Sequence, residues 1–124
     1  MWKELRPKPR LLPPGIMTVG VKGRFRFGAE TIRLWGLSKF CSVKIWQDDK
    51  TPSLIGFQLF EDKKGGDIPL VKDDSTMEFS ARWLVRAVNI QPGRYHANRE
   101  NSFITVDFSH RLTQKQLDTF AKRR

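Results

Sequence analysis

The chain has 124 residues, of which 39% are hydrophobic and 11% aromatic, enough apolar bulk for the core of one domain and too much for disorder throughout. Lys and Arg number 23 against 13 Asp and Glu, and the resulting net charge of +10 is expected to attract polyanions such as nucleic acid. The single cysteine, Cys41, excludes an intramolecular disulfide and a cysteine-based zinc site, and no apolar run approaches the roughly 20 residues that cross a bilayer.

Residues 1–15 are predicted to form a basic, proline-rich arm, because four prolines exclude helix and favour an extended conformation. A first strand-helix-strand unit is expected over residues 16–60. At its start, apolar Val19, Val21, Phe25 and Phe27 alternate with polar or basic residues, which is the period of strands with one buried face.

The rest of the first unit contains a predicted short helix and a hairpin. Residues 29–36 have apolar side chains at three-residue spacing and end in Gly36, which suits a helix stop. Strands are predicted over residues 42–47 and 54–60, with a turn between them. The charged, glycine-containing segment 61–74 is predicted to be a linker.

The same order of elements is predicted again over residues 75–108, as a degenerate second unit with a helix at 81–88. A shift of 52 residues lays Met77 and Phe79 on Phe25 and Phe27. This internal repeat implies two similar units that complete one core. Residues 109–124 carry apolar side chains spaced by three and four and end in three basic residues, so a basic C-terminal helix is expected.

The stretch from Gly23 to Ile45 resembles the core signature of the AbrB-like transition-state regulators, which have a swapped-hairpin DNA-binding fold. The residues that carry the resemblance are a glycine before a strand, two inward apolar residues, a helix that ends in an apolar-Gly-apolar triplet, and a second apolar strand: Gly23, Phe25, Phe27, Trp35-Gly36-Leu37, Val43 and Ile45. Gly28 stands at the family's helix-start proline, and Phe40-Cys41 replaces its Gly-Asp turn. With a second copy the chain would look like the two-unit MraZ group. The resemblance implies a pseudo-symmetric β-rich core, often in dimers or rings, that presents basic strands and loops to DNA. The arginine of the family's helix falls one position late in this chain, at Arg33, which is counted among the candidate DNA contacts.

Candidate nucleic-acid contacts follow from the charge pattern. Lys22, Arg24 and Arg26 are expected on the exposed face of one strand, where they could track successive phosphates; the alternative is a solvated strand face. Arg82 and Arg86, four apart on the second helix, could extend this surface, or they could belong to an ordinary solvent-exposed helix face. The arm could add binding or be a solubilising tail, and its basic residues are Lys3, Arg6, Lys8 and Arg10.

Two further interpretations concern aromatic and acidic residues. Trp2, Trp46 and Trp83 are expected to pack in the core or in an interface, with stacking on bases as the alternative. Asp48 or Asp49 followed by Glu61-Asp62-Lys63 loosely imitates a metal-dependent nuclease. These residues are predicted at separate surface features, and neither a nucleophile motif nor a phosphate loop is present, so no catalytic residue, metal or cofactor is expected.

The sequence therefore predicts an α+β, mainly β fold of two swapped-hairpin units sharing one core, with a C-terminal helix. The predicted function is a non-catalytic, cytoplasmic nucleic-acid-binding protein of bacterial or phage type. DNA is favoured over RNA, a regulatory role and a homo-oligomer are consistent with the family, and no membrane partner is expected. The alternative is a protein-interaction module, such as a phage-encoded inhibitor or an accessory subunit, that binds an acidic partner surface.

Overall fold

The computed structural model describes residues 2–3, 14–73 and 75–122, and this part of the chain is mainly β, with nine strands and three α-helices. The predicted α+β, mainly β class is confirmed. All strand pairs are antiparallel, in the order β5-β3-β4-β9-β8-β1-β2-β7-β6. The strands are β1 (Ile16–Val19), β2 (Arg24–Gly28), β3 (Ser42–Gln47), β4 (Leu54–Phe60), β5 (Ile68–Pro69), β6 (Val71–Lys72), β7 (Thr76–Ser80), β8 (Gly93–Glu100) and β9 (Phe103–Arg111).

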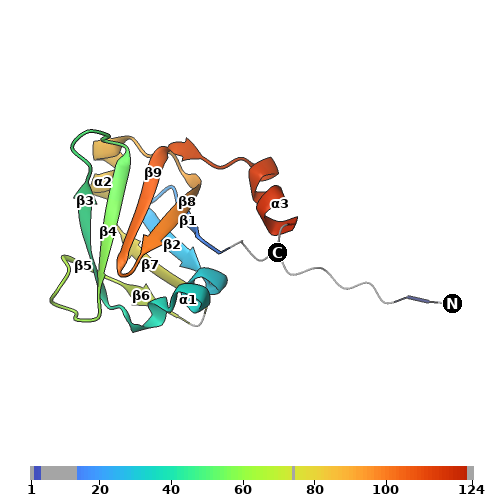
Figure 1. The fold of residues 1–124 in the computed structure, drawn as a ribbon, viewed down its shortest axis with the longest axis horizontal. Helices are drawn as coiled ribbons and strands as arrows, with labels where there is room; N and C mark the ends of the chain where they lie inside the picture. Colours follow the sequence, from blue (N-terminus) through green and yellow to red (C-terminus); the bar gives the residue numbers. More distant parts are fainter. Residues whose placement is uncertain (1, 4–13, 74, 123–124) are drawn as a thin grey trace.

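The sheet curls back on itself, so that its two ends meet. β5 and β6 stand at opposite ends of the strand order but are separated in the chain by Leu70 alone, whose N–H donates to the Cys41 carbonyl over 2.9 Å. In Figure 1, β4 and β9 cross the front of the molecule while β2 and β7 lie behind them. Both strands β5 and β6 lie inside the segment 61–74 that the sequence predicts as a linker.

The core lies between the front and back parts of this curled sheet. Phe25 of β2 stacks on Phe79 of β7, with ring centroids 5.1 Å apart, and Phe57 of β4 approaches both rings at 5.9 and 5.4 Å. Phe108 of β9 contacts Phe25 edge-on at 5.9 Å. These rings are almost fully buried, and aromatic contacts of this geometry add to the free energy gained from apolar burial.

Short helices follow the strands at the predicted places. α1 (Ala29–Trp35) ends at Gly36, whose φ of 62° is left-handed, and α2 (Arg82–Val88) ends at Asn89 with φ 57°. These helices lie at opposite ends of the molecule (Figure 1). α3 (Gln114–Lys122) begins after β9, which runs on to Arg111. Within the described ranges, no helix is long and apolar enough to cross a membrane.

The antiparallel pairing of β2 with β7 is centred on two residues that are 52 positions apart in the sequence. In the β2–β7 pair, Arg26 stands opposite Glu78, and Phe25 and Phe27 stand opposite Phe79 and Met77. The first residues of two other strands are separated by the same offset, because β1 starts at Ile16 and β5 at Ile68. β1 lies between β8 and β2, while the segment of β5 and β6 lies between β3 and β7.

Candidate nucleic-acid interface

The basic residues of β2 are exposed because the strand alternates. Phe25 and Phe27 point into the core and are at most 1% exposed, while Arg24 and Arg26 point outward and are exposed. The tight turn before the strand ends at Gly23, which has φ 78°. A Cβ on Gly23 would lie 2.7 Å from the Arg82 Cα, so only glycine allows this turn to lie against the start of α2.

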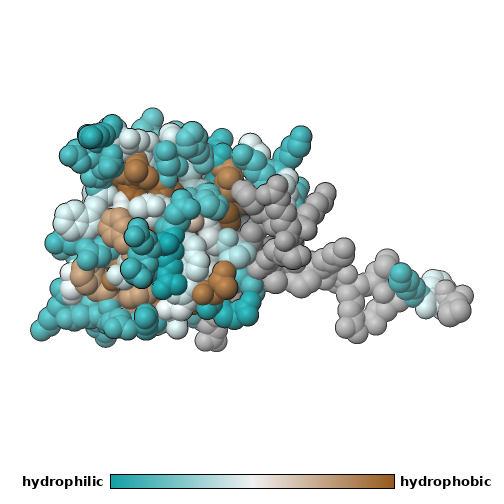
Figure 2. Space-filling model, in the orientation of Figure 1, coloured by the Kyte–Doolittle hydropathy of each residue, from teal (hydrophilic) through white to brown (hydrophobic). Residues whose placement is uncertain are grey.

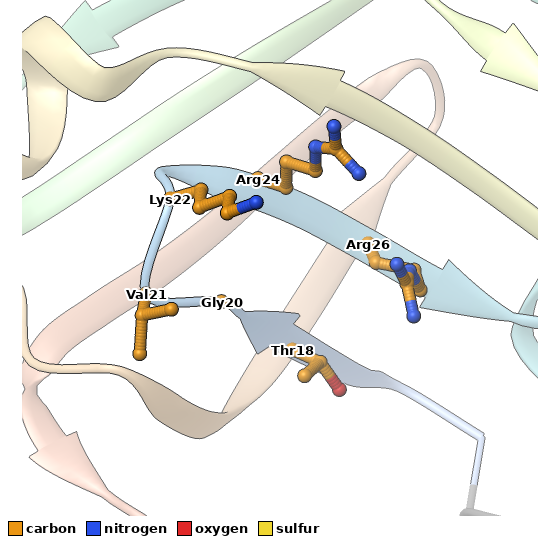
Figure 3. Close-up of a pocket in the computed structure, with 6 residues that line it drawn as sticks. All are labelled: Thr18, Gly20, Val21, Lys22, Arg24 and Arg26. Carbon is orange, nitrogen blue, oxygen red and sulfur yellow. The ribbon is translucent and has the colours of Figure 1, made fainter.

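The turn and the two neighbouring strands form a shallow groove of about 190 Å³, which we call the cationic groove. Figure 3 shows the side chains of Lys22, Arg24 and Arg26 lying along this groove on the same face of the sheet. Side chains two residues apart on a strand are separated by about 6.8 Å, so the two guanidiniums can contact separate anionic groups. The groove is lined by Thr18, Gly20, Val21, Lys22, Arg24 and Arg26.

One of the three cations already has a carboxylate partner. The Arg26 Nη2 lies 3.1 Å from the Glu78 Oε2 on the neighbouring strand β7, and the Arg26 side chain remains 47% exposed. Among the described residues no carboxylate lies within 4.0 Å of the Lys22 ammonium or the Arg24 guanidinium. These two groups are therefore available to an anionic ligand, and Arg26 is available in competition with Glu78.

Further basic residues lie on the elements next to the cationic groove. Arg82 lies against the turn through Gly23, and Arg86 follows one helical turn later on the exposed face of α2. Arg94 of β8 stands opposite Thr18, which in turn stands opposite Arg26, so it belongs to the same row of the sheet. Arg94 is not among the predicted contacts. The sequence feature that could have identified Arg94 is its alternation with Tyr95, which is buried.

Other predicted contact residues are not brought to this groove. Arg33 lies on α1, which follows the far end of β2, and its Nη2 is 2.8 Å from the Glu30 Oε2. Lys3 is exposed, and the predicted contacts Arg6, Lys8 and Arg10 lie outside the described residues.

The positions 52 residues further along are neutral or acidic instead of basic. Thr76 and Glu78 correspond to Arg24 and Arg26. Just before them, Asp73 accepts hydrogen bonds from the backbone N–H groups of Ser75 and Thr76, and these bonds lower the pKa of its carboxyl. The basic strand face is thus a property of β2 and is not repeated on β7.

The tryptophans predicted to pack in the core or in an interface are exposed on the surface of this chain. Trp2, Trp46 and Trp83 are 101%, 49% and 57% exposed, so the expectation of core packing is wrong for these three. Trp35 instead contributes to the core, where it packs edge-on against Phe27. Figure 2 shows apolar side chains reaching the surface at separate points of the face formed by β3, β4 and β9.

The carboxylates considered for a nuclease do not converge. Asp48 and Asp49 lie in the turn before β4 and Glu61 follows its other end, so the length of that strand, about 20 Å, separates them. Within the described part of the chain, no group of three or more His, Cys, Asp or Glu side chains could hold a metal ion.

Comparison of the chain with known protein families, with curated proteins and with solved structures finds no match.

Proposed function

We propose that this chain is a non-catalytic DNA-binding protein of bacterial or phage type, which holds backbone phosphates in the cationic groove. The observation that supports this most is the position of Lys22, Arg24 and Arg26 on one exposed face, where the described residues supply only one carboxylate partner. Guanidinium groups match the geometry of phosphate oxygens, and charge-assisted hydrogen bonds to phosphate are among the stronger polar contacts. The Thr18 hydroxyl in the same groove adds a neutral donor.

The surrounding cations define the direction in which a polyanion would run. Arg94 lies beside the groove on β8, and Arg82 and Arg86 lie beyond the turn on α2. A phosphate backbone that crosses the groove can therefore meet cations on either side of β2. Contacts of this kind fix position and supply affinity, while sequence preference would come from a few side chains and from DNA shape.

The fold part of the proposal is a duplicated swapped-hairpin architecture. The 52-residue offset that relates Arg26 to Glu78, and β1 to the β5–β6 segment, supports two units with exchanged strands. An AbrB-like protein of this type presents basic strands to DNA in a regulatory role and often forms oligomers. Here only the first unit carries the basic strand, so one DNA contact per chain is the consistent arrangement.

The test is fluorescence anisotropy with labelled duplex DNA at rising salt. Affinity should fall steeply with salt, and Arg24→Gln should weaken binding and flatten the salt dependence by about 0.9 in log–log slope. Arg99→Gln is the matched control, because Arg99 is an exposed arginine near the other end of β8. Single-stranded DNA and duplex RNA of equal length separate the nucleic-acid classes. Absence of duplex binding at low salt would contradict the proposal.

One observation favours the alternative of a protein-interaction module. Val21, which lines the cationic groove, is 83% exposed, and Trp83 next to Arg82 is 57% exposed. Exposed apolar and aromatic residues beside arginine are typical of protein interfaces. Recovery of one stoichiometric protein and no nucleic acid by the tagged chain would favour this function, and Arg24→Gln would then weaken that protein's binding.

A further inference from the structure

A second groove lies on the outer face of β3, β4 and β9, away from the cationic groove. It has a volume of about 210 Å³, and we call it the Trp46 groove. Its lining combines aromatic and aliphatic side chains with carboxylates: Trp46, Gln47, Asp48, Asp49, Leu54, Gly56, Phe103 and Thr105. We propose that this groove binds the proline-rich, basic segment at residues 6–14 of the same chain.

The aromatic floor of the groove is built in advance. Gly56, in the middle of β4, has the Phe103 ring directly above it, and a Cβ at this position would lie 2.2 Å from the Phe103 Cζ. The ring therefore lies against bare backbone. Trp46 stands opposite Gly56 on β3, and its indole N–H donates to the Gln58 Oε1 over 3.0 Å. The Lys44 ammonium lies 5.5 Å from the Trp46 ring centroid.

Carboxylates lie at one end of this floor, near the turn between β3 and β4. Asp48 and Asp49 follow Trp46 in the turn between β3 and β4, and Asp107 of β9 stands opposite Leu54. Among the described residues no cation lies within 4.0 Å of the Asp49 carboxylate, whereas one oxygen of Asp48 accepts the backbone N–H groups of Lys50 and Thr51. At the end of the groove formed by the turn, these carboxylates disfavour nucleic acid and favour a cationic ligand, while the Lys44 ammonium lies over the Trp46 ring.

Aromatic rings flanked by carboxylates suit a peptide in which prolines alternate with basic residues. Such a peptide is already restricted to the polyproline II conformation, so it loses little entropy when its rings pack on aromatic side chains. The chain contains this pattern at residues 6–14, RPKPRLLPP, in which Pro7 and Pro9 alternate with three basic residues.

The length of this segment fits the distance to the groove. The Gly15 carbonyl accepts the Ala97 N–H of β8 over 2.7 Å, so the chain leaves β1 beside Ala97, and Asn98 is the next residue along β8. Asn98, Thr105, Gly56 and Trp46 stand opposite one another on β8, β9, β4 and β3. Four strand spacings of about 4.8 Å make about 19 Å, and a polyproline II segment of about six residues covers this distance. Counting back from Pro14, six residues end at Lys8, between Pro7 and Pro9.

The test is paramagnetic relaxation enhancement on the full-length chain. A nitroxide is attached to Lys8→Cys in a Cys41→Ser background, and broadening is measured in two-dimensional ¹H–¹⁵N spectra. The indole N–H of Trp46 and the amides of Gly56 and Thr105 should broaden at least fivefold more than the amide of Leu34, which is exposed on α1. Equal broadening at all these positions, or none, would overturn the proposal.

Two further measurements separate the alternatives. A second sample mixes ¹⁵N-enriched chain that carries no nitroxide with nitroxide-carrying chain at natural isotopic abundance. Broadening at Trp46 in this mixture would show that the segment comes from a second copy, which overturns the intramolecular assignment. In the labelled protein, Asp49→Lys should reduce the Trp46 broadening by at least half, while Asp67→Lys, on an exposed turn, should leave it unchanged. The proposal is independent of DNA binding, because no residue of the cationic groove takes part in the measurement.

Discussion

Replacing Glu78 by Gln is expected to strengthen DNA binding. The substitution keeps the size of the side chain and removes the only carboxylate within 4.0 Å of the cationic groove's guanidiniums among the described residues, at 3.1 Å from the Arg26 Nη2. Arg26 points outward beside Arg24 and is then free to contact phosphate without first losing its partner.

The size of the effect follows from counterion release. One additional phosphate contact adds about 0.9 to the log–log salt slope, which corresponds to a gain in affinity of about fivefold to tenfold at 0.1 M salt. Between 50 and 200 mM salt the variant should lose about three- to fourfold more affinity than the parent chain. The Arg26–Glu78 pair is exposed, so its removal costs only about 0.2–1 kcal/mol of folding stability.

The assay is anisotropy of a labelled duplex at four or more salt concentrations, with thermal unfolding as the check on folding. Glu100→Gln is the matched control, because it removes the same charge from an exposed position at the far end of β8 and should raise affinity much less. An unchanged salt slope in Glu78→Gln, or an equal gain in Glu100→Gln, would refute the assignment of Arg26 to a phosphate contact.

Three further predictions concern stability. Phe57→Ala should lower the free energy of unfolding by about 3–5 kcal/mol in urea titrations, because the ring fills the centre of the core; a loss below about 1 kcal/mol would contradict this packing. Gly56→Ala should destabilise by about 1–3 kcal/mol through the clash with Phe103, and the cost should be much smaller in a Phe103→Ala background; equal costs in both backgrounds would disprove the contact. Hydrogen bonds from Ser109 hold the pKa of Asp107 below its usual value of 3.8. These hydrogen bonds therefore stabilise the fold fully above the pKa that Asp107 has in the unfolded chain, and the stabilisation is lost as the pH falls through the lower pKa of the folded state. Asp107→Asn should make the free energy of unfolding less dependent on pH below about 4. An unchanged dependence on acid pH would argue against these hydrogen bonds.

The local sequence pattern was sufficient to predict most of the helices and strands. The alternation around Phe25 predicts β2 with its basic outer face, and Gly36 marks the end of α1 because a left-handed residue is needed there. The short strands β5 and β6 could not be predicted in this way. They contain two residues each in a charged, glycine-containing segment, and their pairing depends on strands distant in the sequence.

The candidate site could be predicted only in part for the same reason. Lys22, Arg24 and Arg26 share a face because they alternate along one stretch of chain. The ion pair between Arg26 and Glu78, by contrast, depends on the register between β2 and β7. The position of Arg82 depends on how closely α2 approaches Gly23. The ion pair and the approach of α2 to Gly23 are contacts between residues far apart in the sequence, so a local periodicity of apolar residues cannot predict them.

The meeting of β5 and β6 also restricts how this protein can recognise anything. An open sheet has an unpaired edge strand, onto which a peptide or a second molecule can add by backbone hydrogen bonds. Here the strand order ends, within the described part of the sheet, in two strands of two residues each, which are neighbours in the chain. β5 covers only Ser42 and Val43 of β3, and β6 covers only Met77 and Glu78 of β7, so strand addition is confined to the remaining residues of these two edges. Elsewhere on the sheet specificity must come from side chains on the outer face, so surface substitutions there can change the choice of partner without changing the fold.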